Sequence, residues 1–289
     1  MFQVGVSFNI LRDDEHILVG YNKYSGHIIC LVKMDFTRKS RWVKDGHRTP
    51  DLEDSKYAGV VSQETVRIAL TYVALHGTEV LASETRNAYV QAPTLEKHYI
   101  ICGEEFGLEN VGNRALIVRA LYGGKAARRD FWHHFRNCIK FLGFKSKGGD
   151  PDVWMRPNKK QDGTEVYEYV LLYIDDYLVV YENAESILKN EIGRYFELKP
   201  DSIGPPSLYL GGHLRKVVMN TCIEAWDFGS IQYVQASVKN FEEYLSKNGQ
   251  LLKVKDLNPL TKGYCPEIDI SKELGSKEDS YYQSLIGIV

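Results

Sequence analysis

Apolar residues recur at helical spacing in several stretches of the chain. After Ser62, the residues Val66, Leu70 and Val73 fall on one helical face, and Gly77 ends the run. Serine before such a run and glycine after it are common helix boundaries, so this pattern predicts a helix. The same reasoning predicts helices at residues 128–142, 184–196 and 231–247.

Shorter apolar runs predict β-strands between these helices. They lie at residues 79–81, 99–102, 115–118, 153–155, 167–173 and 177–181. The turn Gln161-Asp162-Gly163 separates two of the runs and predicts a hairpin. A strand at 208–210 precedes Gly211 and Gly212, and the strand that follows is expected to pair with 221–226. Residues 29–43 indicate extended chain, and the last forty residues are expected to be rich in loops.

Two adjacent aspartates, Asp175 and Asp176, stand between apolar runs at 171–174 and 177–180. If these runs are paired strands, the aspartates lie at the tip of a hairpin, where side chains reach water. Adjacent carboxylates repel each other, which raises the proton affinity of one unless a cation lies between them. Without a lysine nearby, such a tip is a candidate site for a divalent cation that prefers oxygen ligands, such as magnesium. A polar turn without chemistry is the alternative, and the pair alone favours that interpretation.

Composition narrows the class of protein. The 289 residues are 44% hydrophobic and 26% charged, as in ordinary soluble domains, and no segment has the composition of a disordered chain. Five cysteines without a CxxC pair exclude a zinc ribbon and disfavour a disulfide framework, which fits a reduced intracellular setting. No signal peptide is visible, and the longest apolar stretch, 169–181, is too short to span a bilayer. We therefore expect a soluble protein.

Charge is distributed unevenly along the chain. The net charge of -2 does not by itself indicate a nucleic-acid binder. However, five cations lie close together, namely Lys33, Arg38, Lys39, Arg41 and Lys44. Such a run is often only a solvated strand, but its density in a slightly acidic protein favours a role in binding anions.

Several motifs together resemble one family. Tyr-Ile-Asp-Asp at 173–176 resembles the Tyr-x-Asp-Asp box of reverse transcriptases. The other segments resemble copia-type retrotransposon reverse transcriptases: Leu-Tyr-Gly at 121–123 with Phe-Trp at 131–132, Gly-Phe at 143–144 with Asp-Pro at 150–151, Leu-Tyr-Leu-Gly-Gly at 208–212, and Tyr-Gln-Ser-Leu-Ile-Gly at 282–287. The motifs keep the family's order across nearly the whole chain.

This resemblance implies an α+β fold of the right-hand polymerase type, in which helices cover an antiparallel palm sheet. The implied parts are an N-terminal extension at 1–30, fingers at 31–78 and 99–127, palm at 79–98 and 128–206, a primer-grip hairpin at 207–230, and a partial thumb and connection at 231–289. The chain stops inside the apolar run 286–289, so we expect truncation before an RNase H segment.

The resemblance also implies magnesium-dependent DNA synthesis from a primed RNA or DNA template. In the family, three carboxylates hold two Mg2+ ions, with Mn2+ as a possible substitute. Asp175 and Asp176 match two of these catalytic, metal-binding positions, and Glu84 stands where the family has aspartate. The side chain of glutamate is longer by one methylene, about 1.5 Å, so we expect a weakened site.

Further roles follow from the same resemblance. The dNTP-binding positions are Lys39, Arg41, Asn87, Ala88 and Tyr89, and Tyr89 would exclude a ribose 2′-hydroxyl. The primer grip is Tyr209, Leu210, Gly211 and Gly212, and the nucleic-acid backbone would meet Lys125, Arg128, Arg129 and Arg136. The implied partners are an RNA template, a primer strand and dNTPs, with RNase H and integrase regions elsewhere in the element and no membrane. The implied location is intracellular, either in cytoplasmic virus-like particles or in the nucleus.

Two other functions remain open from the sequence. One is a catalytically inactive, nucleic-acid-binding remnant or domesticated fragment, which the glutamate at position 84 favours. The other is a different palm-type enzyme, such as a nucleotide cyclase, which also uses paired carboxylates on a hairpin. The copia-like motifs outside the palm count against the cyclase.

Overall fold

The computed structural model describes residues 7–12, 14–17, 19–32, 36, 38–49, 57–146, 148–160, 163–220, 223–251 and 273–286. The described chain combines α-helices with several antiparallel sheets, so the α+β class is confirmed. The chain divides into two compact units, residues 1–206 with 218–225, and residues 207–217 with 226–289. Among the described helices, none has the length and apolar content needed to cross a membrane.

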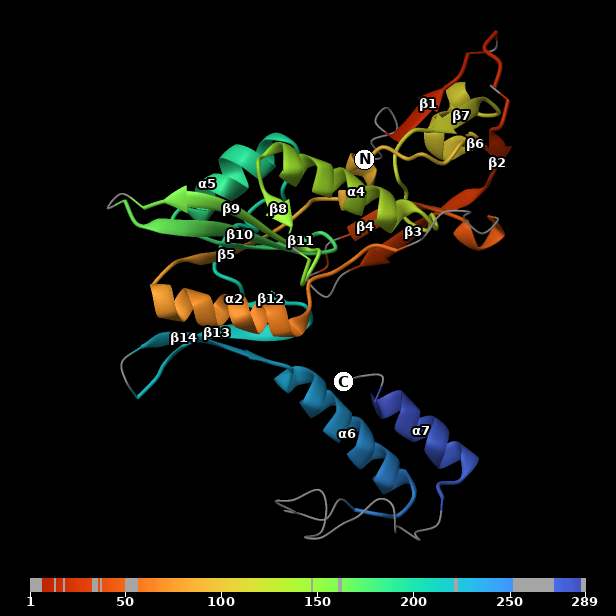
Figure 1. Ribbon diagram of the computed structural model, residues 1–289. Coiled ribbons are helices and arrows are strands. Elements are labelled where there is room, and N and C mark those ends of the chain that lie inside the picture. Colours follow the sequence, from red (N-terminus) through yellow and green to blue (C-terminus); the bar gives the residue numbers. More distant parts are fainter. Residues whose placement is uncertain are drawn as a thin grey trace. The chain divides into compact units, whose positions relative to one another are not determined.

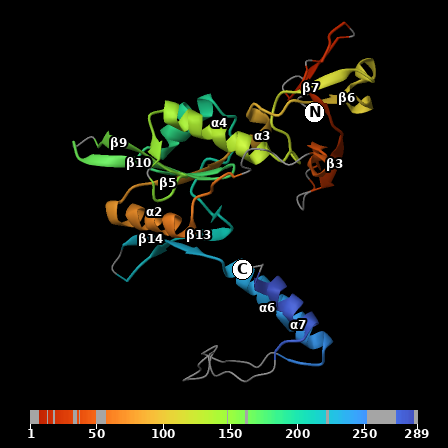
Figure 2. The same cartoon turned by 45° about the vertical axis from the view of Figure 1, so that its right-hand side comes forward.

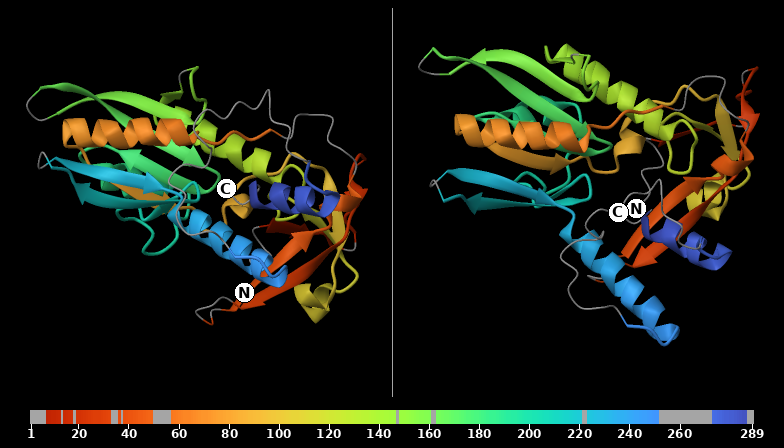
Figure 3. Two further views of the ribbon diagram at one scale, coloured as in Figure 1. Left: turned by 90° about the horizontal axis from the view of Figure 1, so that it is seen from below. Right: turned by 60° about the horizontal axis from the view of Figure 1, so that its bottom comes forward.

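The centre of the first unit is a five-stranded antiparallel sheet (Figure 1). Its spatial order is β5 (Val80–Glu84), β11 (Asp176–Val180), β10 (Glu165–Tyr173), β9 (Val153–Lys159) and β8 (Lys145–Ser146). The predicted hairpin joins β9 to β10 and is closed by a hydrogen bond from the Lys160 amide to the Thr164 carbonyl, although Gln161 and Asp162 lie outside the described residues. In Figure 3 this hairpin is the long green pair of strands.

Helices cover both faces of this sheet, as Figures 1 and 2 show. On one face Val170 and Leu172 pack in a core with α4 (Ala127–Phe141) and α5 (Ala184–Ser186). On the other face Tyr169 and Leu171 lie beside α2 (Gln63–His76). A strand buried on both faces has no polar alternation, which explains the continuous apolar run in β10.

The predicted helix boundaries are largely confirmed. Ser62 caps α2 by accepting a hydrogen bond from the Thr65 amide, and Gly77 ends it in a left-handed conformation. Gly143, at a φ of +87°, follows α4 in the same way. The predicted helix at 184–196 is irregular, because α5 continues through a π-helical turn at Ile187–Glu191 and a 3-10 turn at Ile192–Arg194.

A smaller sheet and a hairpin complete the first unit. The sheet has the order β1 (Phe8–Ile10), β7 (Arg114–Ile117), β6 (His98–Ile101) and β2 (Asn22–Lys23). Residues expected to form an N-terminal extension therefore supply its two outer strands. The hairpin of β3 (Gly26–Val32) and β4 (Arg38–Lys44) carries the dense cations, although Lys33 lies outside the described residues. Trp42 of β4 packs edge-to-face on Phe8, with ring centroids 5.3 Å apart, which joins hairpin and sheet.

The second unit contains a three-stranded sheet of β12 (Leu208–Tyr209), β13 (Gly212–Val218) and β14 (Glu224–Gly229), followed by α6 (Ile231–Lys247) and α7 (Ser276–Ile286). The Tyr244 and Tyr281 rings stack 4.0 Å apart, and the Tyr281 hydroxyl donates to the Asn240 carbonyl. These contacts pack α6 against α7, the two blue helices of Figure 3. The expectation of loops in the last forty residues is wrong at α7.

Candidate carboxylate site and adjoining pocket

The turn between β10 and β11 holds the aspartate pair. Tyr173 pairs with Asp176, so Ile174 and Asp175 form a two-residue turn. Ile174 has a φ of +56°, a conformation that β-branched residues rarely adopt and that tight hairpins usually give to glycine. The Thr85 amide donates to the Asp175 carbonyl at 2.8 Å and ties the turn to β5. Strained residues of this kind are concentrated at functional sites.

Strand pairing brings Glu84 to the aspartates. Glu84 is the last residue of β5 and lies directly opposite Asp176 of β11. Side chains of directly paired residues lie on the same face of a sheet, with Cβ atoms about 5 Å apart. Asp175 occupies the adjoining turn, so three acidic residues that are distant in sequence meet at one end of the sheet.

The carboxylates disfavour each other's charge. Burial, and then the charges of Asp175 and Glu84, raise the pKa of Asp176 to about 7. Burial also raises the pKa of Asp175, and Glu84 adds to that effect, whereas Arg41 and Lys39 oppose it. A bound cation would relieve this repulsion, and carboxylate oxygens are ligands that Mg2+ accepts.

Lys199, which the sequence did not indicate as part of the site, lies beside Glu84. The Lys199 ammonium forms an ion pair with the Glu84 carboxylate, so the expectation that no lysine lies nearby is wrong. Within the described ranges, no group of three or more His, Cys, Asp or Glu side chains is placed to hold a metal ion. The donor chemistry of Asp175 and Asp176 fits a divalent cation, whereas Glu84 does not fit as a ligand while Lys199 holds its carboxylate.

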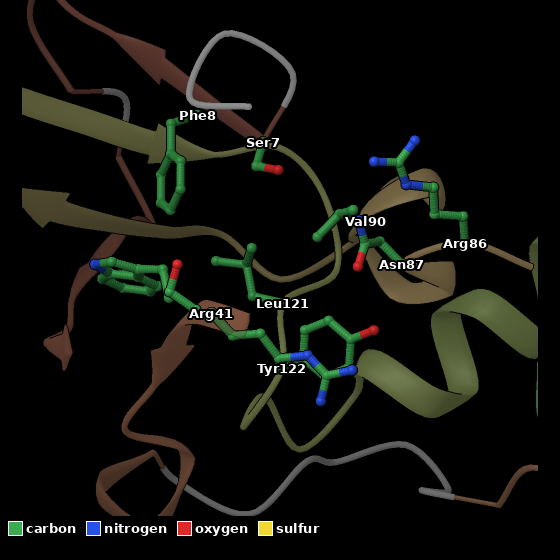
Figure 4. Close-up of a pocket in the computed structure, with 10 residues that line it drawn as sticks. Ser7, Phe8, Arg41, Arg86, Asn87, Val90, Leu121 and Tyr122 are labelled. Atoms are coloured by element: carbon green, nitrogen blue, oxygen red, sulfur yellow. The ribbon is translucent and has the colours of Figure 1, made fainter. Parts of the chain in front are cut away.

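A pocket of about 150 Å³ lies between β4, the residues around the start of α3 (Ala88–Gln91) and the loop before α4 (Figure 4). Arg41 and Asn87 line it, together with Arg86 and Tyr122. The Arg41 guanidinium lies 4.2 Å from the centroid of the Tyr122 ring, and that ring lies 4.9 Å from the Tyr89 ring.

These contacts connect the pocket with the carboxylates. Burial raises the pKa of Tyr89, and the charge of Asp175 raises it further. Of the five expected dNTP-binding residues, Arg41 and Asn87 line the pocket. Lys39, Arg41 and Tyr89 interact electrostatically with Asp175. Ala88 is buried. The sequence interpretation gave no role to Tyr122 or Arg86, although Tyr122 belongs to the Leu-Tyr-Gly motif. Arg86 is tied to Glu197 by an ion pair of 2.7 Å.

The basic residues of α4 divide into interior and surface groups. Arg129 is only 8% exposed and pairs with Asp130 at 3.0 Å. Arg136 lies over the Trp132 ring and 3.5 Å from the fully buried Asp152. The expected single basic surface is therefore corrected, because buried carboxylates engage these two arginines.

Of the three arginines of α4, only Arg128 is exposed on the surface. Lys125, just before the helix, donates to the Thr49 carbonyl at 2.6 Å.

The expected primer-grip residues form a tight turn in the second unit. Tyr209 is buried, and Leu210 and Gly211 adopt φ values of +51° and +73°. A Cβ atom added to Gly212 would lie 2.2 Å from the Phe228 ring. Glycine at 212 is therefore required for the close packing of β13 on β14.

Neither the models of known protein families nor the sequences of curated proteins match this chain. Its function is therefore inferred from its own residues and their geometry.

Proposed function

We propose that the chain is the polymerase portion of a copia-type reverse transcriptase, which synthesises DNA on a primed RNA or DNA template with magnesium. The observation that carries this proposal is the pairing of β5 with β11, which sets Glu84 opposite Asp176 and beside Asp175. The ordered motifs of the sequence support it. In this proposal the five-stranded sheet is the palm of a right-hand polymerase, and the β3–β4 hairpin belongs to the fingers.

Each group near the site has a proposed part in the reaction. Asp175 and Asp176 would hold the divalent cations, which activate the primer 3′-hydroxyl and stabilise the pyrophosphate leaving group when bound. Arg41 and Lys39 carry positive charge toward Asp175 and would bind the triphosphate. Tyr89 would lie against the sugar and exclude a 2′-hydroxyl.

The remaining proposed contacts are with nucleic acid. Arg128, exposed on α4, would contact a phosphate of the template strand, and Lys125 lies near it in the chain. The turn from Tyr209 to Gly212 would approach the primer, since glycine allows close backbone contact. The proposed partners are thus an RNA template, a primer and dNTPs.

Primer extension tests this function. With Mg2+ or Mn2+ and an oligonucleotide-primed RNA, the wild type should extend the primer, and Asp175→Asn or Asp176→Asn should reduce the rate at least about a hundredfold. Glu185→Gln is the matched control, because Glu185 is an exposed carboxylate on α5 that is paired with Lys189. Unchanged extension by both asparagine variants would exclude this catalytic site.

A second function is favoured by the ion pair between Glu84 and Lys199, which engages the third carboxylate. In that case the chain is a nucleic-acid-binding remnant without catalysis. A silent wild type together with an active Glu84→Asp variant would indicate an intact but misadjusted polymerase site. Silence of both proteins, combined with tight and salt-dependent binding to a primed duplex, would favour the remnant.

A further inference from the structure

Residues 198–204 follow the irregular helix that begins with α5, and they run along β5. This segment places Lys199 at the end of the strand. Leu198 bridges to Thr85, and Gly204 bridges to Ala82. The Ser202 hydroxyl accepts a hydrogen bond from the Glu84 amide at 3.3 Å. The backbone position of this segment is therefore determined by its pairing with β5.

Lys199 contacts Glu84 through both its backbone and its side chain. Its amide donates to the Glu84 carbonyl at 2.8 Å, and its ammonium returns to the carboxylate of the same residue. The Lys199 and Glu84 side chains are 48% and 37% exposed, so water screens their attraction. The charge of Lys199 also partly opposes the rise in the pKa of Asp176. A fixed backbone and a weak ion pair therefore keep one positive charge beside three carboxylates.

We infer that Lys199 is a positioning residue that holds Glu84 in the metal-free protein and competes with a divalent cation for its carboxylate. This inference rests on the proposed metal chemistry of the site. An ammonium and a metal ion cannot occupy the same carboxylate oxygen, and their like charges repel each other. Because exposed ion pairs are weak, a divalent cation would displace the lysine from Glu84 at a small loss of affinity. In the metal-free protein Lys199 thus engages the Glu84 carboxylate beside the aspartates.

Mn2+ binding to the full chain, measured from the electron paramagnetic resonance signal of free Mn2+, tests the competition. Lys199→Met removes the charge and should tighten Mn2+ binding by up to about fivefold, which corresponds to the loss of an exposed ion pair. Lys199→Arg retains the ion pair and should bind as the wild type does. Lys189→Met is the matched control, because it removes a lysine from a similarly exposed pair with Glu185.

A double substitution separates competition from a general effect of charge. In a Glu84→Gln background, Lys199→Met should produce a clearly smaller gain, because the carboxylate for which lysine and metal compete is gone and only repulsion between the charges remains. A gain of the same size in both backgrounds would overturn the inference, since Lys199 would then act only through space. Equal affinities for Lys199→Met and Lys189→Met, or no Mn2+ binding by either protein, would also overturn it. Thermal unfolding in chelator checks that every variant folds.

The outcomes for Lys199 and for the polymerase are distinguishable. An active wild type whose Mn2+ affinity does not respond to Lys199→Met contradicts the inference alone. Competition for Mn2+ in a protein that never extends a primer contradicts the polymerase and leaves the inference standing.

Discussion

Asp176 bears a charge that its surroundings disfavour. Its pKa of about 7 in the folded protein is well above the ordinary value of about 3.9 expected in the unfolded chain. At pH values between about 4 and about 7, Asp176 is therefore protonated in the folded state and ionised in the unfolded state. The stability contributed by this group is therefore complete below about pH 4 and is lost as the pH rises to about 7.

Asp176→Asn should for this reason stabilise the metal-free protein more at pH 8 than at pH 5, with a difference on the order of 2 kcal/mol. The asparagine has no charge to bury and remains neutral at both pH values. Chemical denaturation in the presence of chelator measures the free energy of unfolding. The exposed Glu185→Gln should show no such difference, and an equal effect of Asp176→Asn at both pH values would contradict the assignment of the raised pKa to this group.

Tyr89 leads to a prediction about substrate choice that depends on the proposed polymerase. Its ring lies 4.9 Å from Tyr122 and 6.4 Å from Phe131, so neighbouring rings support it in one orientation. Tyr89→Ala should lower the preference for dNTPs over ribonucleotides about tenfold or more, whereas Tyr89→Phe keeps the ring and should keep the preference. The ratio of kcat/KM values for the two sugars measures it. An unchanged ratio in Tyr89→Ala would remove Tyr89 from that role.

The sequence could assign some residues to the candidate site but not others. The sequence predicted that Asp175, Asp176 and Glu84 belong together, because their motifs are local and keep their order along the chain. The roles of Lys199, Arg129 and Arg136 were not foreseen, because the carboxylates that engage them are brought close only by folding. Periodicity predicts which face of an element is buried, but it does not predict which buried acid a given arginine will meet.

At the scale of elements, a partly buried ion-pair network joins β9, β10 and the helix that continues from α5. Arg156 contacts both oxygens of Glu191, at 2.8 and 2.9 Å, and also pairs with Glu168. The Glu168 side chain is only 3% exposed. Burial lowers the pKa of Arg156, but the two acids outweigh this effect and the pKa is raised, so the guanidinium remains charged. The network therefore holds β9 and β10 against this helix.

Arg156→Met should destabilise the protein by about 3–5 kcal/mol, because it leaves the buried Glu168 without a counter-ion. Lys159→Met removes a cation from the same strand, but its pair with Glu165 is largely exposed, so a loss below about 1 kcal/mol is expected. Urea denaturation at neutral pH measures both changes. Similar losses in the two variants would mean that the network adds little to stability.

Elements were predicted best where their boundaries are set locally. The ends of α2 follow from Ser62 and Gly77, and both were predicted. β5 extends to Glu84, beyond the predicted run 79–81, because pairing with β11 rather than hydrophobicity maintains its last residues. The helix α7 was missed because its sequence is largely polar and gives only a weak periodic signal.

At the scale of the whole molecule, the net charge conceals where positive charge is available. Arg129, Arg136 and Arg156 are paired with acids inside the protein, so they contribute little to the field outside it. The pKa of Lys44 is lowered by burial, and this lysine pairs with Glu96 at 3.0 Å. The composition alone therefore could not reveal which cations remain on the surface, and among the arginines of α4 that residue is Arg128.

Arg128 provides the test of that surface. If the proposed template contact is made, Arg128→Gln should weaken binding to a primed RNA–DNA duplex similarly for different sequences, and should lower the slope of log affinity against log salt by about 1. Fluorescence anisotropy at several salt concentrations measures both quantities. Arg136→Gln is the matched comparison, because Arg136 faces the buried Asp152, so removal of its charge should lower stability while leaving the salt slope unchanged. A slope that responds to Arg136 and not to Arg128 would mean that nucleic acid approaches another face of this unit, since a phosphate contact requires a cation that solvent can reach.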